Sequence, residues 1–172
     1  DDSPCRSSQC TDWTSPLSFG CEAAIVSNCL RYFEFDRQAC LDYDYLYVQC
    51  RFNQLSAKTA RLLSNGTTYG RGGLGIIYVF ASGNEYDYGS DVNWDGFLNS
   101  RHIISVGALD RDLNHASYSV TGAALTVTAP GGDFDAVRNM ITTVPLSFGL
   151  DGDCGDAGVG TSYACPLVSG VV

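Results

Sequence analysis

The sequence is short of basic residues and has no long apolar run. Ten Lys and Arg stand against nineteen Asp and Glu in 172 residues, so the formal net charge is −9 with His neutral. A chain this acidic is a poor candidate for binding nucleic acid or anionic membranes. The longest strongly apolar stretch, Ile76–Ala81, is far shorter than the roughly 20 residues that cross a bilayer as a helix. We therefore expect neither a nucleic-acid partner nor a membrane-spanning segment in this chain.

Zinc-binding patterns are also missing. There is no Cys-x-x-Cys pair, and the only two histidines, His102 and His115, are isolated. Cysteines are nevertheless frequent and unevenly placed, at positions 5, 10, 21, 29, 40, 50, 154 and 165. Six of eight within the first 50 residues favour a disulfide framework from an oxidising compartment over a metal site, with the pairing left open. The glycosylation sequon Asn65-Gly66-Thr67 is consistent with secretion.

The remaining composition is that of a globular domain. Apolar residues make up 45% of the chain and charged residues 17%, which argues against disorder, coiled coil and collagen. The chain begins at Asp1 without a leader sequence and ends at Val172 inside an apolar run. We expect it to be a piece of a longer protein.

The pattern of apolar residues predicts an α/β fold. Residues 1–19 indicate a loop, the spacing of Cys21, Ile25 and Cys29 predicts a helix through about Phe35, and a further helix is expected from Leu55 to Ser64, ending at Asn65-Gly66. Three apolar runs predict strands, at residues 76–81, 103–106 and 125–129. Strands that are apolar on both sides are typical of a parallel sheet covered on both faces.

Ser162 and Asn84 are the candidate reactive residues. Ser162 is expected at the start of a helix after a flexible, Gly-rich approach, where free backbone N–H groups and the helix dipole favour a developing oxyanion. Asn84 directly follows the strand at 76–81, and ligands bind at the carboxyl ends of parallel strands. The plainer alternatives are that Thr161 or Ser162 only caps a buried helix and that Asn84 belongs to a Gly-Asn turn.

Six segments taken together are more specific than any of these residues alone. They are Tyr-Val-Phe-Ala-Ser-Gly-Asn at 78–84, Asp-Gly-Phe-Leu-Asn-Ser at 95–100, Ile-Ile-Ser-Val-Gly-Ala at 103–108, Ser-Tyr-Ser at 117–119, Ala-Pro-Gly-Gly at 129–132 and Gly-Thr-Ser-Tyr-Ala-Cys-Pro at 160–166. In this order the chain resembles a subtilisin-like serine protease of the peptidase S8 family, most closely its kexin/furin (proprotein convertase) branch. The resemblance covers residues 55–172, the C-terminal part of the catalytic domain, and residues 1–54 resemble a Cys-rich helical or loop insertion.

The resemblance implies a mainly parallel, doubly wound sheet and a catalytic Asp, His and Ser in that chain order. Ser162 takes the place of the nucleophile and Asn84 that of the oxyanion donor. The Asp and His are expected upstream of residue 1. Neither His102 nor His115 has the Gly-Thr that follows the family's catalytic His, so both are expected to be non-catalytic.

Carboxylates of the convertase branch shape a pocket for Arg or Lys beside a calcium ion. Asp95 matches the acidic pocket base, although an Asp-Gly turn is an equal alternative. Asp2 matches an acid after the substrate-binding strand, and Asp91 lies near a calcium ligand. Val120 stands where the branch has another acidic ligand, so calcium remains only a possible cofactor.

The implied function is a serine endopeptidase of the secretory pathway or extracellular space that processes proproteins after basic residues. Its partner would be a peptide or protein substrate, and this chain alone would lack the catalytic Asp and His. The alternative is a catalytically inactive subtilisin-like domain that serves as a binding module. Cys165, in the helix after Ser162, is expected to be a small apolar filler, and Cys154 a disulfide cysteine.

Overall fold

The protein is described from a computed structural model, which covers residues 23–29, 54–134, 140–143 and 154–172. The main sheet holds four strands in the order β1-β2-β3-β4, all parallel: β1 (Ile25–Asn28), β2 (Ile77–Ala81), β3 (Ile103–Leu109) and β4 (Val127–Pro130). A second, antiparallel sheet pairs β5 (Met140–Thr143) with β6 (Cys154–Gly158). The helices are α2 (Ala57–Gly73) and α3 (Thr161–Ser169), with short 3₁₀ turns at η3 (Tyr86–Tyr88) and η4 (Val92–Trp94).

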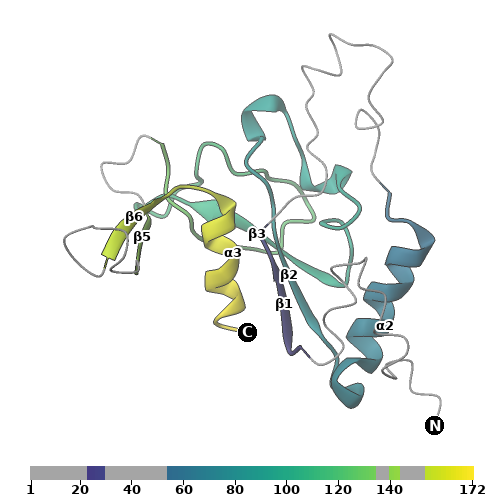
Figure 1. The fold of residues 1–172 in the computed structure, drawn as a ribbon. Coiled ribbons are helices and arrows are strands. Elements are labelled where there is room, and N and C mark those ends of the chain that lie inside the picture. The colour runs from purple at the N-terminus through teal and green to yellow at the C-terminus, as the bar shows by residue number, and fades with distance from the viewer. Residues whose placement is uncertain (1–22, 30–53, 135–139, 144–153) are drawn as a thin grey trace.

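Helices cover both faces of the main sheet. Alternate residues of β2 point to opposite sides: Val79 and Ala81 pack in an apolar cluster with Ala164 and Cys165 of α3. Tyr78 and Phe80 pack in a second cluster with Leu63 of α2. Figure 1 shows α2 and α3 on either side of the strands. The predicted α/β fold with a doubly covered, parallel sheet is therefore confirmed, and so are the strands expected at 76–81 and 103–106.

The helix predicted around Ile25 is wrong, because Ile25–Asn28 forms strand β1, which pairs in parallel with β2. Ile25 and Cys29 lie against one apolar cluster and Val26 against the other. A spacing of four residues returns to the same side of a strand as well as to the same side of a helix. The described part of residues 1–54 thus contributes a strand to the main sheet, and the predicted division at residue 54 stays a prediction.

Helix α2 begins as predicted and ends later than predicted. Ser56 is its N-cap, and the Ser56 hydroxyl accepts a hydrogen bond from the Thr59 N–H at 3.1 Å. The chain continues helically through Asn65-Gly66. A Cβ on Gly66 would run into the hydroxyl of Tyr78 on β2. Gly66 therefore serves close packing of α2 on the sheet, and the helical backbone is first interrupted at Gly70. No helix in the described ranges is long and apolar enough to cross a membrane.

Candidate active site

The start of α3 is built by a sharp turn at Gly160. Gly160 is the N-cap residue, with φ 151°, and no side chain caps the helix, so the interpretation of Thr161 or Ser162 as a simple cap is wrong. The Gly160 N–H donates to the Gly131 carbonyl at 2.9 Å, which fixes the approach to the helix. The flexible Gly-rich approach expected before Ser162 is in part strand β6.

Ser162 lies in the first turn of α3, close to the end of β1. Its hydroxyl donates a hydrogen bond to the backbone carbonyl of Cys29 at 3.0 Å. Cys29 directly follows β1, so the contact joins segments 133 residues apart. The first N–H groups of a helix have no acceptor within the helix and carry its positive dipole end. Ser162 therefore combines a hydroxyl with backbone donors at the carboxyl end of the sheet.

Asn84 reaches the same place from the end of β2. Its side-chain oxygen accepts hydrogen bonds from the N–H and the hydroxyl of Thr161, both at 2.9 Å. Because a backbone N–H can only donate, this contact fixes which side-chain atom of Asn84 is the oxygen. A Cβ placed on Gly160 would lie 3.6 Å from Asn84 Nδ2 and 3.7 Å from the backbone nitrogen of Ser162. Two N–H donors thus border one small space, which stays open because residue 160 is glycine.

The end of β4 and the two glycines that follow it, Gly131 and Gly132, pack against this turn. A Cβ on Gly131 would lie 2.9 Å from the Gly160 carbonyl oxygen and 2.6 Å from the Ala108 side chain, so only glycine fits. The buried Tyr118 hydroxyl donates to the carbonyls of Gly131 and Gly132 at 2.9 and 2.8 Å. Burial raises the pKa of Tyr118 to about 12, which keeps this hydroxyl protonated and able to donate.

Neither histidine contacts Ser162 in the structure. His102 stands just before β3, at the opposite end of the parallel strands, and its Nδ1 is 2.9 Å from the Thr67 hydroxyl. His115 follows β3, but its Nε2 is 2.8 Å from the Ser119 carbonyl and its ring lies edge-on to Tyr86. The expectation that these histidines are non-catalytic stays a prediction.

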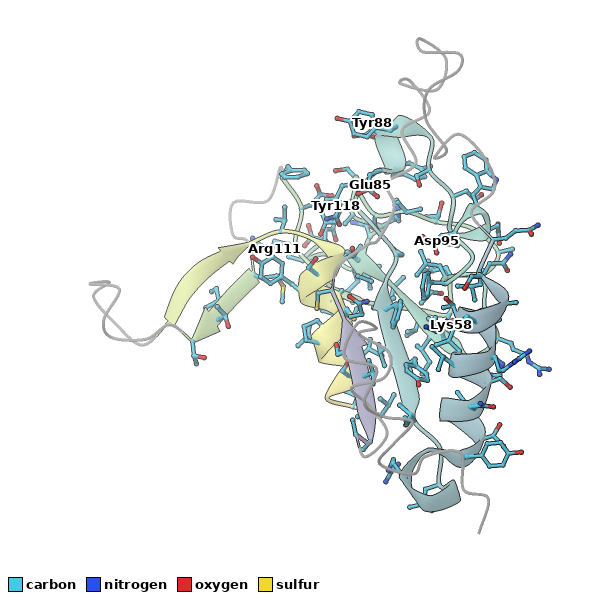
Figure 2. All side chains as sticks on the ribbon, turned by 45° about the vertical axis from the view of Figure 1, so that its right-hand side comes forward. Lys58, Glu85, Tyr88, Asp95, Arg111 and Tyr118 are labelled. Atoms are coloured by element: carbon cyan, nitrogen blue, oxygen red, sulfur yellow. The ribbon has the colours of Figure 1, made fainter. Side chains whose placement is uncertain are left out.

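Asp95 is buried, with only 5% of its surface exposed, and closes a turn. Its Oδ1 accepts hydrogen bonds from the N–H groups of Phe97 at 2.8 Å and Leu98 at 3.2 Å. Figure 2 shows Asp95 towards the α2 side of the molecule, with Glu85 and Tyr118 closer to the start of α3. The Asp-Gly turn that the sequence offered as the alternative is therefore present, and a role as pocket base stays a prediction.

Asp91, the other predicted carboxylate within the described residues, caps a short 3₁₀ turn. Asp91 Oδ1 accepts a hydrogen bond from the Asn93 N–H at 2.8 Å, as the N-cap of η4. Within residues 23–29, 54–134, 140–143 and 154–172, no three Asp, Glu, His or Cys side chains gather around one point. Val120 is fully buried. Calcium as a cofactor therefore stays a prediction, and Asp2 lies outside the described residues.

Three neighbours of the site were not predicted from the sequence. Thr161 orients Asn84, Cys29 accepts the Ser162 hydroxyl, and Glu85 accepts the Asn84 N–H at 2.9 Å. Thr161 precedes Ser162 and Glu85 follows Asn84, so their positions in the sequence could have suggested a role for both. Cys29 is distant from Ser162 in sequence, so its contact with Ser162 could be found only from the position of β1 in the fold. Cys29 and Cys165 are free thiols in the structure, which differs from the disulfide framework expected for Cys29.

Comparison with known proteins places this fold and site in a family. The model of the Subtilase family matches residues 48–172. Since the match covers most of the chain, the chain belongs to the subtilase family. It is 38% identical over 112 residues to "Kexin" of Saccharomyces cerevisiae and 40% identical over 113 residues to "Dibasic-processing endoprotease" of Schizosaccharomyces pombe. These matches cover 64% and 66% of the chain but only 13% and 15% of the relatives.

Solved structures agree on the fold. The serine protease of Aeromonas sobria matches with a TM-score of 0.63 at 20% identity, covering 86% of this chain and 29% of that chain. The complex of that protease with its chaperone matches with a TM-score of 0.55 over 69% of this chain and 27% of that chain. The chain therefore has the α/β fold of subtilisin-like proteins, as part of a domain.

Proposed function

We propose that this chain carries the nucleophile and the oxyanion-binding groups of a serine endopeptidase. The observation that carries the proposal is that Asn84 Nδ2 and the Ser162 backbone nitrogen both border the place where a Cβ on Gly160 would lie, at 3.6 and 3.7 Å. Ser162 also carries the hydroxyl. Two fixed donors beside a hydroxyl suit the tetrahedral intermediate of acyl transfer. The names of the relatives support the proposal, since two of them are an endoprotease and a kexin.

The reaction begins with attack of Ser162 Oγ on the scissile carbonyl carbon. The hydroxyl proton goes to a general base, the carbonyl oxygen becomes an oxyanion held by Asn84 Nδ2 and the Ser162 N–H, and the C–N bond then breaks as the amine takes up the proton. Water releases the acyl group by the same steps. The Cys29 carbonyl that now accepts the Ser162 hydroxyl cannot take its proton, so the hydroxyl must turn towards the base.

We propose that the base comes from outside the described residues. Both His102 and His115 are hydrogen-bonded away from Ser162. We propose that a segment upstream of residue 1 supplies the Asp and His, as the family resemblance implies. The isolated 172-residue chain should consequently stay unlabelled by a fluorophosphonate, because an unassisted serine hydroxyl is a weak nucleophile.

For the substrate, we propose proproteins cut after basic residues in the secretory pathway or outside the cell. The proposal is supported by the name of the relative called a dibasic-processing endoprotease and by the net charge of −9. Asp95→Asn in the full gene product tests the pocket role, because the amide oxygen still accepts from Phe97 and Leu98 while the charge is lost. A fall in the preference for Arg and Lys substrates supports the pocket role, and an unchanged preference contradicts it.

The decisive test of the activity is labelling of the full gene product with a fluorophosphonate, followed by peptide mass spectrometry. The adduct is expected on Ser162 and should vanish in Ser162→Ala. Lack of labelling in a folded protein that still binds peptides would instead favour the binding module. That alternative draws support from the hydrogen bond that holds the Ser162 hydroxyl on the Cys29 carbonyl.

A further inference from the structure

Two cysteines lie close to the candidate nucleophile. Cys29 is half-buried after β1, and Cys165 is fully buried in α3, three residues after Ser162. The Cys29 side chain packs against the apolar cluster that contains Cys165. Burial raises the pKa of the Cys165 thiol, and the nearby Cys29 thiol raises it further. Both are free thiols in the structure.

The contacts of Cys165 place its sulfur against the chain that carries Cys29. Cys165 Sγ donates to the carbonyls of Asn28 at 3.6 Å and Val79 at 3.4 Å, and it lies 3.6 Å from the Ser27 hydroxyl. Asn28 immediately precedes Cys29. Two of these three contacts of the Cys165 sulfur are therefore with Ser27 and Asn28, the two β1 residues directly before Cys29.

If Cys165 only filled space in the core, a second thiol beside it would serve no purpose. A lone buried cysteine behaves as a small apolar residue, whereas two thiols in contact can be joined by a bond once an oxidant reaches one of them. Cys29 is the reachable partner because it is only partly buried. Burial raises the pKa of Cys165 to about 11, so the Cys29 thiol is the one expected to react first with an oxidant.

We propose that Cys29 and Cys165 form a redox-active dithiol that closes to a disulfide and ties β1 to α3 beneath Ser162. With glutathione disulfide as the oxidant, the Cys29 thiolate attacks one sulfur and releases one glutathione. The Cys165 sulfur then attacks the Cys29 sulfur of the mixed disulfide, the bond from Cys29 to glutathione breaks, and the Cys165 proton leaves with the second glutathione, which is released as a thiol. Two protein thiols are oxidised and one glutathione disulfide is reduced to two thiols.

The disulfide acts on the nucleophile through the Cys29 carbonyl, and this consequence rests on the proposed function. The Ser162 hydroxyl donates to that carbonyl. Cys29 would therefore be both the crosslinked residue and the residue whose carbonyl accepts this hydrogen bond. A crosslink at Cys29 fixes the acceptor against α3, so the hydroxyl is retained there and less available to a general base. Oxidation should therefore lower the reactivity of Ser162, and a thiol reductant should restore it.

The crosslink itself is tested without any activity measurement. The full gene product is treated with glutathione disulfide, alkylated, digested and examined by mass spectrometry. A peptide pair joined between Cys29 and Cys165, lighter than the two reduced peptides by two hydrogen atoms, is expected. It should be absent in Cys29→Ser and in Cys165→Ala. Recovery of Cys29 only as a glutathione adduct, or crosslinks of either cysteine to other cysteines alone, would overturn the proposal.

A second readout separates this proposal from the proposed function. Fluorophosphonate labelling of Ser162 should fall to a minor fraction on oxidation and return with reductant, while Cys165→Ala keeps its labelling under the same oxidant. Equal inactivation of Cys165→Ala assigns the effect to other cysteines and overturns the regulatory part. A crosslink that forms in a protein never labelled in either state supports the dithiol and counts against the endopeptidase.

Discussion

Asn84→Asp separates the two roles that the structure gives to the Asn84 side chain. The side-chain oxygen accepts from the Thr161 N–H and hydroxyl, and the nitrogen faces the space shared with the Ser162 N–H. A carboxylate keeps both acceptor contacts and loses the donor. The variant should therefore fold normally and lose activity. Asn84→Ala, the matched variant, loses both roles.

The magnitudes follow from the contacts. Loss of one oxyanion donor costs roughly 10²–10³ in kcat, about 3–4 kcal/mol, and the carboxylate charge would repel the oxyanion further. Thr161 is only 1% exposed, so in Asn84→Ala its N–H and hydroxyl lose a buried acceptor. An unsatisfied buried donor costs about 1–3 kcal/mol, and the unfolding free energy of Asn84→Ala should fall by about 2 kcal/mol or more.

The assays are kcat on a basic peptide substrate and urea unfolding, both on the full gene product. Asn84→Asp should show the large loss of kcat with near-normal unfolding, and Asn84→Ala should show both losses. The reasoning is refuted if Asn84→Asp retains kcat within about threefold, because a donor at this place is then not used. Normal unfolding of Asn84→Ala would refute the contacts to Thr161.

Three further predictions concern the support of the site. Gly66→Ala should cost about 1–3 kcal/mol in urea unfolding, because the new methyl meets the Tyr78 hydroxyl; no loss would contradict the close packing of α2 on β2. Tyr118→Phe removes the donor to the Gly131 and Gly132 carbonyls and should cost about 1 kcal/mol by the same assay, whereas an unchanged midpoint would place the hydroxyl elsewhere. Burial works to raise the pKa of Asp133, but hydrogen bonds, mainly from Ser117, outweigh it and hold the pKa below its ordinary 3.8. The ionised Asp133 carboxylate thus stabilises the folded protein above pH 3.8, and this stabilisation is lost as the pH falls through the lowered pKa. The urea midpoint of Asp133→Asn should change less with pH over this range than that of the wild type. Equal changes of the midpoint with pH in the two proteins would contradict this.

The strands were predictable where the apolar signal was continuous. β2 and β3 are flanked on both faces by packed side chains, so residues 76–81 are apolar throughout and residues 103–106 are apolar except for Ser105. β1 was not predictable as a strand, since four residues are too few to distinguish the two periodicities. The end of α2 was missed because the sequence does not reveal that Gly66 packs on Tyr78.

The candidate site was predictable in part. Local motifs identified Ser162 and Asn84, and the structure places Asn84 on the residue adjoining Ser162. The turn at Asp95 was one of two alternatives that its Asp-Gly sequence offered. The contact of Ser162 with Cys29 spans 133 residues, and the meeting of Cys29 with Cys165 depends on the same tertiary packing of β1 against α3. No local pattern encodes such contacts.

The central claim is that Asn84 and the start of α3 hold one oxyanion beside Ser162. A crystal structure of the full gene product with a phosphonate adduct on Ser162 tests it most directly. The account predicts a phosphonyl oxygen at about 2.7–3.1 Å from both Asn84 Nδ2 and the Ser162 backbone nitrogen. A phosphonyl oxygen that points away from Asn84, with no hydrogen bond to either donor, would contradict it.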